Sequence, residues 1–175
     1  MKRAGRSALL VAAMLVALTG CKSTSQTPNP KPTPTASATL TPIHVAEMFY
    51  VGDTPPGFKL FSENYRVTGL GLTSLTKLIS DLLDGRAKPL DPDYSNLWGH
   101  GTSLLSIKVD VPSVTVDLNL GKLNLGSEAE MRAIDEIFWT IAKFMPKITR
   151  MNLLVDGKKI ESLAGHVDAT KAFLL

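Results

Sequence analysis

Two short runs near the middle of the chain alternate apolar and polar side chains, which is the pattern of half-buried β-strands. The first run, SLLSIKVD, covers residues 103–110, and the second, SVTVDLN, covers residues 113–119. The apolar positions expected to share one face are Leu105, Ile107, Val109, Val114, Val116 and Leu118. Asp110-Val111-Pro112-Ser113 between the runs has the composition of a turn. We therefore predict an antiparallel hairpin with one apolar face.

Two other stretches carry the period of amphipathic helices. In residues 69–85 the apolar positions are Leu75, Leu78, Ile79, Leu82 and Leu83. Thr73 or Ser74 is the candidate N-cap of this helix, and Gly85 is its expected end. In residues 127–145 the apolar positions are Ile134, Ile137, Phe138, Ile141 and Met145. Both helices would bury one stripe against a sheet.

The second helix also has boundary signals at both ends. Ser127-Glu128-Ala129-Glu130 matches a capping box, in which the Ser127 hydroxyl caps the helix and Glu130 reaches back to the cap. Pro146 cannot continue a helix and is expected to end it.

Three further segments have the composition of strands, at residues 45–51, 58–67 and 149–155. Thr54-Pro55-Pro56-Gly57 predicts a turn between the first two strands, and Asp156-Gly157 predicts a tight turn after the third. The elements then follow the order strand, strand, helix, strand, strand, helix, strand. This order predicts an α+β fold with two helices packed on one face of an antiparallel or mixed sheet.

A sheet that is covered by helices on one face leaves its other face to water or to a partner. The outward positions of the central hairpin and of the strand after the second helix are polar or charged. We take them as the candidate interaction face: Ser106, Lys108, Thr115, Asp117, Arg150 and Asn152.

The first 20 residues have the three parts of a secretory signal peptide. Lys2, Arg3 and Arg6 form the basic start, and the apolar run of residues 8–18 is too short to span a bilayer. The run ends in Leu18-Thr19-Gly20-Cys21, which resembles the lipobox of bacterial lipoproteins. The resemblance implies cleavage before Cys21, a diacylglycerol on its sulfur and anchoring at the outer side of the cell membrane. An ordinary secreted protein is the alternative.

Residues 21–42 follow as a Ser-, Thr- and Pro-rich segment with no aromatic residue, which predicts a disordered linker. Such a linker would lift the domain from the membrane by about 25 Å as a coil, or by up to ~65 Å if its prolines hold it extended. We assign the domain to residues 43–165 and a C-terminal tail to residues 166–175.

The formal net charge of +3 is that of the three basic residues in the signal peptide, because the remaining chain has equal numbers of cationic and anionic side chains. The mature chain therefore has no basic surplus for nucleic acid. A single cysteine excludes an internal disulfide and a cysteine-built metal site.

The chain carries no motif of catalysis or of metal binding. The three histidines, His44, His100 and His166, are far apart in the sequence and lack a ligand spacing. Asp110, Asp117 and Asp156 are the carboxylates that could serve as acid and base, but two of them occupy turn positions and none has a companion motif. We expect no enzyme activity, no cofactor and no metal.

The loop of residues 86–101 contains Trp98 beside Leu97. A tryptophan in such a loop more often closes the edge of a core than forms a platform for a ligand. The second reading remains open, in which the loop holds an apolar or glycan ligand near Trp98.

The ordered segments together resemble the GerMN domain, a module of bacterial sporulation, germination and cell-envelope lipoproteins. The resemblance covers residues 43–165, and the segments that carry it are Leu82-Leu83-Asp84-Gly85, Gly101-Thr102, Val116-Asp117-Leu118, Thr149-Arg150 and Leu154-Val155-Asp156-Gly157. It implies a non-enzymatic domain related in architecture to the ring-building motifs of secretion and sporulation complexes. The chain carries one copy, whereas spore-associated members are expected to carry two.

Two hypotheses of function follow. The first is a membrane-anchored extracytoplasmic lipoprotein, held by lipid on Cys21, whose domain binds an envelope protein or assembles with itself. The second is a solute-binding lipoprotein that uses the loop around Trp98.

Overall fold

The structure is a computed structural model that describes residues 41–55, 57–99 and 101–175. The predicted signal peptide, Cys21 and nearly all of the predicted linker lie outside the described residues. The described residues belong to one compact unit. No helix among them is long and apolar enough to cross a membrane.

The elements confirm the predicted order and add three two-residue strands. Their bounds are β1 Ile43–Thr54, β2 Gly57–Thr68, α1 Gly71–Leu83, β3 Tyr94–Ser95, β4 Ser103–Asp110, β5 Ser113–Asn119, α2 Ser127–Phe144, β6 Arg150–Val155, β7 Lys158–Lys159 and β8 Phe173–Leu174.

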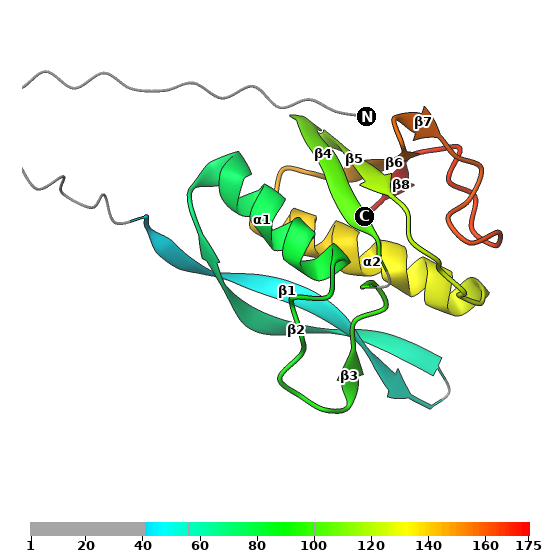
Figure 1. The fold of residues 1–175 in the computed structure, drawn as a ribbon, viewed down its shortest axis with the longest axis horizontal. Helices are drawn as coiled ribbons and strands as arrows, with labels where there is room; N and C mark the ends of the chain where they lie inside the picture. Colours follow the sequence, from blue (N-terminus) through cyan, green and yellow to red (C-terminus); the bar gives the residue numbers. More distant parts are fainter. Residues whose placement is uncertain (1–40, 56, 100) are drawn as a thin grey trace, which may run out of the picture. The chain divides into compact units, whose positions relative to one another are not determined.

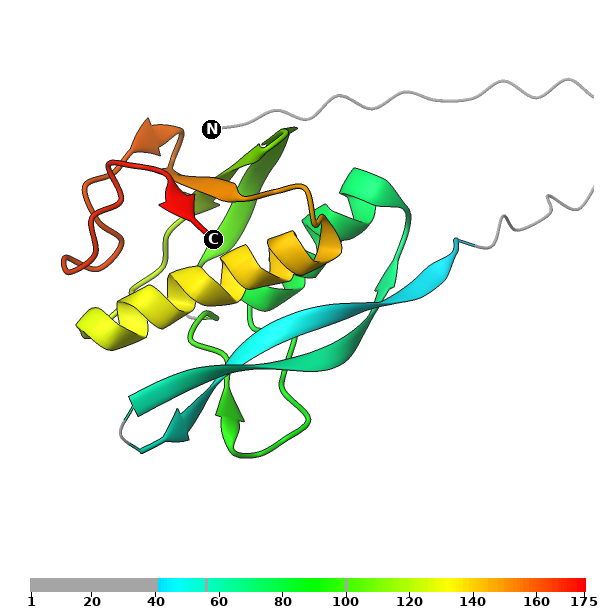
Figure 2. The ribbon, with the colours of Figure 1, turned by 180° about the vertical axis from the view of Figure 1, so that it is seen from behind.

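The α+β class is confirmed, and the strands divide between two sheets. The first sheet has the order β2-β1-β3, and the second has the order β4-β5-β6-β7, with β8 also pairing with β6. In both views the two helices lie between the β1–β2 hairpin and the strands of the second sheet (Figure 1 and Figure 2). Each sheet therefore has helices on one face only.

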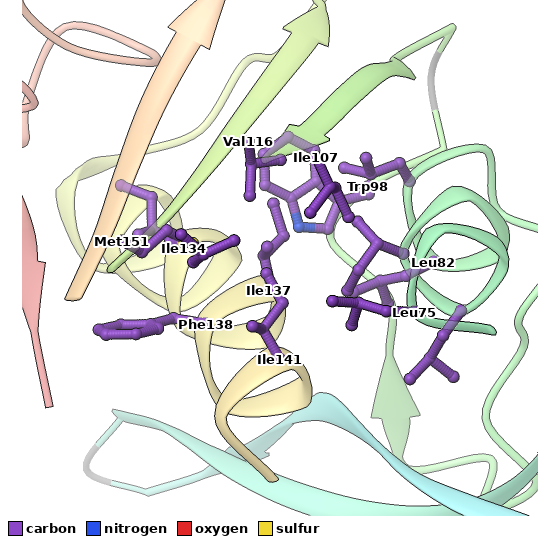
Figure 3. Packing of buried hydrophobic residues seen from close by; sticks show 14 of the residues in the cluster. Leu75, Leu82, Trp98, Ile107, Val116, Ile134, Ile137, Phe138, Ile141 and Met151 are labelled. Carbon is purple, nitrogen blue, oxygen red and sulfur yellow. The ribbon is translucent and has the colours of Figure 1, made fainter. Parts of the chain in front are cut away.

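A helix layer between two sheets suits the wide buried surface of α2. Nine residues of this helix are buried, and they extend beyond the single stripe predicted from its large apolar side chains. A helix buried on so much of its circumference needs cover on two sides. The core joins α1 and α2 to the inner faces of the strands, with Ile107 and Val116 from the second sheet opposite Ile134 and Ile137 (Figure 3).

The predicted inward position of Leu105 is wrong. The pairing of β4 with β5 shifts between Leu104 and Ser106, so that Leu104 faces Leu118 and Ser106 faces Asp117. The extra residue of this β-bulge is Leu105, whose side chain is 51% exposed. Leu104 takes its place and packs against the core.

Both predicted N-caps are also wrong. The first helix starts at Gly71 after Leu70, before Thr73 and Ser74, and no side chain caps it. The second helix starts at Ser127 itself, its N-cap is Gly126, and the capping box does not form. Glu130 does not reach back because its carboxylate binds a distant loop, described below.

The predicted turns and helix ends are confirmed. Gly85 has a φ of 72°, which lies in the left-handed region that glycine adopts without strain. Asp156 and Gly157 have φ values of 50° and 73°, as a two-residue hairpin turn requires, and they join β6 to β7. Phe144 ends α2 two residues before Pro146.

Candidate interaction face

The candidate interaction face lies on the second sheet, on the side away from the helices. The register places Lys108, Thr115 and Asn152 in one row across β4, β5 and β6. Ser106 and Asp117 share the next row with Leu154, and Arg150 lies opposite Ser113 in the row on the other side. The structure therefore brings all six predicted residues together on three adjacent strands.

Asp117 is the member of this face with a defined structural contact. Its Oδ1 accepts a hydrogen bond from the backbone N–H of Gly157 at 2.9 Å, and the neighbouring Asn119 donates to Asp156 at 2.9 Å. These two contacts tie the end of β5 to the β6–β7 turn. One oxygen of the Asp117 carboxylate is therefore occupied by a contact within the fold.

The cations of the face are more available than its carboxylate. Lys108 and Arg150 are exposed, and neither forms a salt bridge with another residue in the described part of the chain. The side chains of Thr115 and Asn152 make no hydrogen bond to another described residue. The face thus offers polar groups that are free to bind a partner.

Glu130 is a site residue whose role the sequence did not indicate. Its side chain is fully buried, and its two carboxylate oxygens accept four backbone N–H groups, from Leu163, Ala164, His166 and Val167, at 2.8 to 3.2 Å. The contacts span 33 to 37 residues of sequence. A capping-box motif gives no signal for such a contact, because the partner loop contributes only backbone groups.

Trp98 closes the edge of the core, which is the first of the two roles considered for it from the sequence. Its side chain is 2% exposed, and its indole Nε1–H donates a 2.9 Å hydrogen bond to the carbonyl oxygen of Ala133 on α2. Figure 3 places the indole among Ile107, Val116 and Leu82. A shallow hollow of about 480 Å³ lies outside it, along residues 85–99, with Tyr94 in its wall.

Glu136 on α2 also holds the loop that contains Trp98. This fully buried carboxylate accepts hydrogen bonds from the backbone N–H groups of Leu97 and Val51. Burial raises the pKa of Glu136 well above its ordinary value, and the two amide bonds oppose that shift only in part. The contact links β1, α2 and the loop of Trp98.

Asp81 is a further buried carboxylate, 2% exposed, near the end of α1. It pairs with Lys77 at 2.7 Å and Arg86 at 2.9 Å, and it accepts a hydrogen bond from the Tyr65 hydroxyl. Burial and this hydrogen bond raise the pKa of Tyr65 to about 12. The cluster fastens β2 and the loop after α1 to the helix.

The histidines and turn aspartates that the sequence singled out do not converge. His44 lies on β1 against the ring of Phe144, and His166 is exposed in the C-terminal segment. His100 lies outside the described residues. Asp110 is exposed at the end of β4, and Asp156 binds Asn119. No group of three or more His, Cys, Asp or Glu residues in the described ranges is placed to hold a metal ion.

The domain has an α+β fold in which two helices lie between a long hairpin and a mixed sheet. Residues 53–161 match the Germane family, which is described as sporulation and spore germination. The match spans more than half of the chain, so the protein belongs to this family and carries a GerMN-type domain.

Three solved structures share this fold. A protein from Clostridium perfringens, provisionally assigned as a lipoprotein, is 22% identical over 75% of this chain and 87% of its own, with a TM-score of 0.52. The tandem GerMN domains of the sporulation protein GerM from Bacillus subtilis are 16% identical, with a TM-score of 0.59, and this chain spans 49% of their length. The first GerMN domain of GerM alone is 13% identical over 73% of this chain and 97% of its own, with a TM-score of 0.55.

At these identities the likeness concerns the fold. The chain spans about half the length of the tandem protein, as one domain would. No curated protein matches the chain.

Proposed function

We propose that the protein is a lipid-anchored component of the cell envelope whose GerMN-type domain is a non-catalytic interaction or assembly module. Lipid on Cys21 holds the chain at the extracytoplasmic face of the membrane. The linker of residues 21–42 then presents the domain to a partner in the envelope. Membership of a sporulation and germination family and the fold shared with a provisionally assigned lipoprotein support this proposal.

The observation that carries the proposal is the free polar face of the second sheet. Lys108, Thr115 and Asn152 form a row whose side chains have no ion-pair or hydrogen-bond partner in the described part of the chain. The buried carboxylates, in contrast, are each bound by groups of their own chain. A surface of unengaged polar groups on a rigid sheet suits recognition better than catalysis.

In-cell photo-crosslinking tests this proposal in the full chain. A photoreactive amino acid replaces Ser106 or Arg150 on the face, and the control replaces the exposed Ser62 on β2 of the first sheet. We expect crosslinks from the face and few from the control. A single envelope protein among the products identifies a heterologous partner, and crosslinks between copies identify self-assembly. Equal yields from all three positions would contradict the proposal.

The alternative function is a solute-binding lipoprotein, and the hollow beside Trp98 is the observation in its favour. Trp98 itself is turned into the core, so a ligand there would contact Tyr94 and the loop backbone first. In a Trp139→Phe background, Trp98 is the remaining tryptophan, and its fluorescence reports on the loop. Saturable quenching by cell-wall fragments would favour this alternative, and a flat titration would count against it.

A further inference from the structure

The outer face of the first sheet exposes apolar side chains near the start of β1. The residues of β1 that alternate on this face, away from the core, are Ile43, Val45, Glu47 and Phe49. Ile43 and Val45 are 67% and 60% exposed, and Phe49 is half-buried. Large apolar side chains that share one exposed row indicate a surface with a partner, whereas single ones do not.

Helix α2 extends this row with an exposed tryptophan. Trp139 is 44% exposed, and the centroid of its ring lies 6.0 Å from that of Phe49. One helical turn further on, Lys143 pairs with Glu47 at 3.3 Å. Two successive turns of α2 therefore contact two successive outward positions of β1. Trp139 and the β1 row form one continuous surface.

Two exposed leucines lie at the same end of the domain. Leu70 precedes α1 and Leu72 is in its first turn, and both are exposed. The N–H of Gly69 donates to the carbonyl oxygen of Pro42 at 3.0 Å, which holds the start of α1 beside the start of β1. Figure 1 and Figure 2 both show these two starts at one end of the domain. This is the end at which the predicted linker enters.

We call this surface the docking surface, and its apolar members are Ile43, Val45, Phe49, Leu70, Leu72 and Trp139. The charged side chains on the outer face of β1 and β2 and on α2 around Trp139 are Glu47, Asp53, Arg66, Arg132, Asp135 and Lys143. Cations and carboxylates are equal in number among them, and Arg132 pairs with Asp135 as Lys143 does with Glu47. Net charge therefore selects no partner here, and the apolar side chains decide what the surface binds.

The occupant that this surface suits is a lipid bilayer. Tryptophan has an apolar ring and a polar N–H, and it is enriched where a membrane meets water. The proposed lipid on Cys21 would keep the domain within ~65 Å of a membrane through residues 22–42, which join the domain at the docking surface itself. A tether of this kind gives an effective concentration on the order of 1 mM, so a weak apolar contact suffices.

We propose that the docking surface lies on the membrane to which Cys21 is anchored, with Trp139, Ile43 and Val45 at the level of the lipid headgroups. The contact is apolar and requires no anionic lipid. Because the helices lie between the two sheets, the interaction face of the second sheet then points away from the membrane. This inference rests on the proposed function and adds the orientation of the domain.

Fluorescence quenching by brominated lipid tests the proposal. The chain from Cys21 onward contains the whole compact unit, and its single cysteine couples to a maleimide lipid in phosphatidylcholine vesicles. Bromine on the upper acyl chains should lower the tryptophan emission by roughly a third, because Trp139 is one of two tryptophans and Trp98 is buried in the core. Phosphatidylglycerol or raised salt should leave this quenching unchanged.

Variants of the coupled chain locate the contact. Trp139→Phe should abolish the quenching, since only Trp98 then emits. The double variant Ile43→Ser, Val45→Ser keeps both tryptophans and should reduce the quenching by about half or more. Leu174→Ser is the matched control, because it removes an equally exposed apolar side chain from the second sheet and should change nothing. Circular dichroism checks that each variant keeps its fold.

Four outcomes would overturn the proposal. They are no quenching in the unsubstituted chain, equal quenching in Trp139→Phe, no effect of the double serine variant, or quenching that requires phosphatidylglycerol. A shift of Trp139 emission that grows with the density of protein on vesicles without bromine, and is not accompanied by quenching, would identify a second copy as the occupant instead.

The coupling makes this test independent of lipidation in the cell. A chain that carries no lipid on Cys21 in cells would contradict the proposed anchor, while the quenching of the coupled chain would still be measured. A lipidated chain whose coupled form shows no quenching would overturn the docking alone and leave the interaction function standing.

Discussion

Three carboxylates in the domain are almost completely removed from water, and each is stabilised differently. Asp81 has two cations and a hydroxyl, and Glu130 has four backbone amides. Glu136 has backbone amides from Leu97 and Val51 and no cation among its contacts. Because burial disfavours the charged form, the pKa of Glu136 is raised well above its ordinary value.

The raised pKa of Glu136 predicts a pH-dependent stability. The ordinary value is 4.5, and the folded-state value lies above it. Between these two pH values the folded protein binds one more proton than the unfolded chain, so the free energy of unfolding falls as the pH rises through this interval. Glu136→Gln removes this titration. We therefore expect the stability of Glu136→Gln relative to the wild type to increase from pH 4.5 to pH 8.

Urea unfolding of both proteins at a series of pH values measures this difference. Other titrating groups are common to the two chains, so their contributions cancel in the comparison. Glu136→Leu is the control for the hydrogen bonds, since it also removes the titration but leaves the amides of Leu97 and Val51 without an acceptor. It should be destabilised at every pH by about 1–3 kcal/mol per lost acceptor. A constant difference between Glu136→Gln and wild type across the pH series would refute the assignment.

At the scale of elements, alternation located the central hairpin correctly but could not locate its bulge. Leu104 and Leu105 are adjacent and both apolar, so either one can continue the inward face that includes Ile107. The choice depends on pairing with β5, where Leu104 faces Leu118. Alternation along a single strand carries no information about its partner, and the register stayed undetermined at this point.

The bulge predicts effects of different size for two neighbouring leucines. Leu104→Ala removes a side chain that packs against the core and should lower the free energy of unfolding by about 1–2 kcal/mol. Leu105→Ala removes a half-exposed side chain and should change it by less than about 0.5 kcal/mol. Chemical denaturation of the two variants makes the comparison. A larger loss in Leu105→Ala would show that the strand has the simple alternating register.

The six residues of the interaction face could be predicted because their placement requires only the alternation within a strand and the order of the strands. The role of Glu130 was not, since its four partners are backbone groups more than thirty residues away. Its sequence context, Ser127 followed by Glu130, favours a local contact that the fold replaces by a distant one. The N–H groups of the loop, which are buried or half-buried at these contacts, would otherwise lose their acceptors, and satisfying four of them outweighs one capping bond.

Glu130→Ala should release the loop that it holds. We expect a loss of roughly 3 kcal/mol in the free energy of unfolding and faster hydrogen exchange at residues 163–167. Glu128→Ala is the matched control, because Glu128 occupies the same first helical turn and bonds the N–H of Phe58 instead. It shares the effect of a lost charge at the helix N-terminus but should leave exchange at 163–167 unchanged. Equal acceleration in both variants would mean that helix fraying, and not the loop contact, controls exchange.

At the scale of the whole molecule, the sequence indicated the order of elements and left open how many sheets the strands form. Strand β1 of the hairpin pairs with β3, which lies in the loop that contains Trp98. The hairpin shares no strand with the second sheet. The two sheets are separated by α2, which is buried on a wide part of its surface. This buried surface includes polar residues such as Glu136 and Thr140. Thr140 is fully buried and accepts a hydrogen bond from the N–H of Phe49 at the edge of β1. Apolar periodicity alone counts such positions as solvent-facing.

In the proposed function, lipid on Cys21 decides where this domain works, and a substitution of this residue tests the proposal. A single sulfur carrying two acyl chains binds a membrane stably, whereas a chain without them relies on an apolar segment that a signal peptidase removes. We expect Cys21→Ser to move the protein from the membrane fraction to the soluble extracytoplasmic fraction or to leave it as an unprocessed precursor. Metabolic labelling with an alkyne fatty acid should mark the wild type and not the variant. Ser23→Ala, two residues further on, controls for changes near the cleavage site and should retain label and anchoring. Label that persists in Cys21→Ser would contradict the anchor, because Cys21 is the only cysteine in the chain.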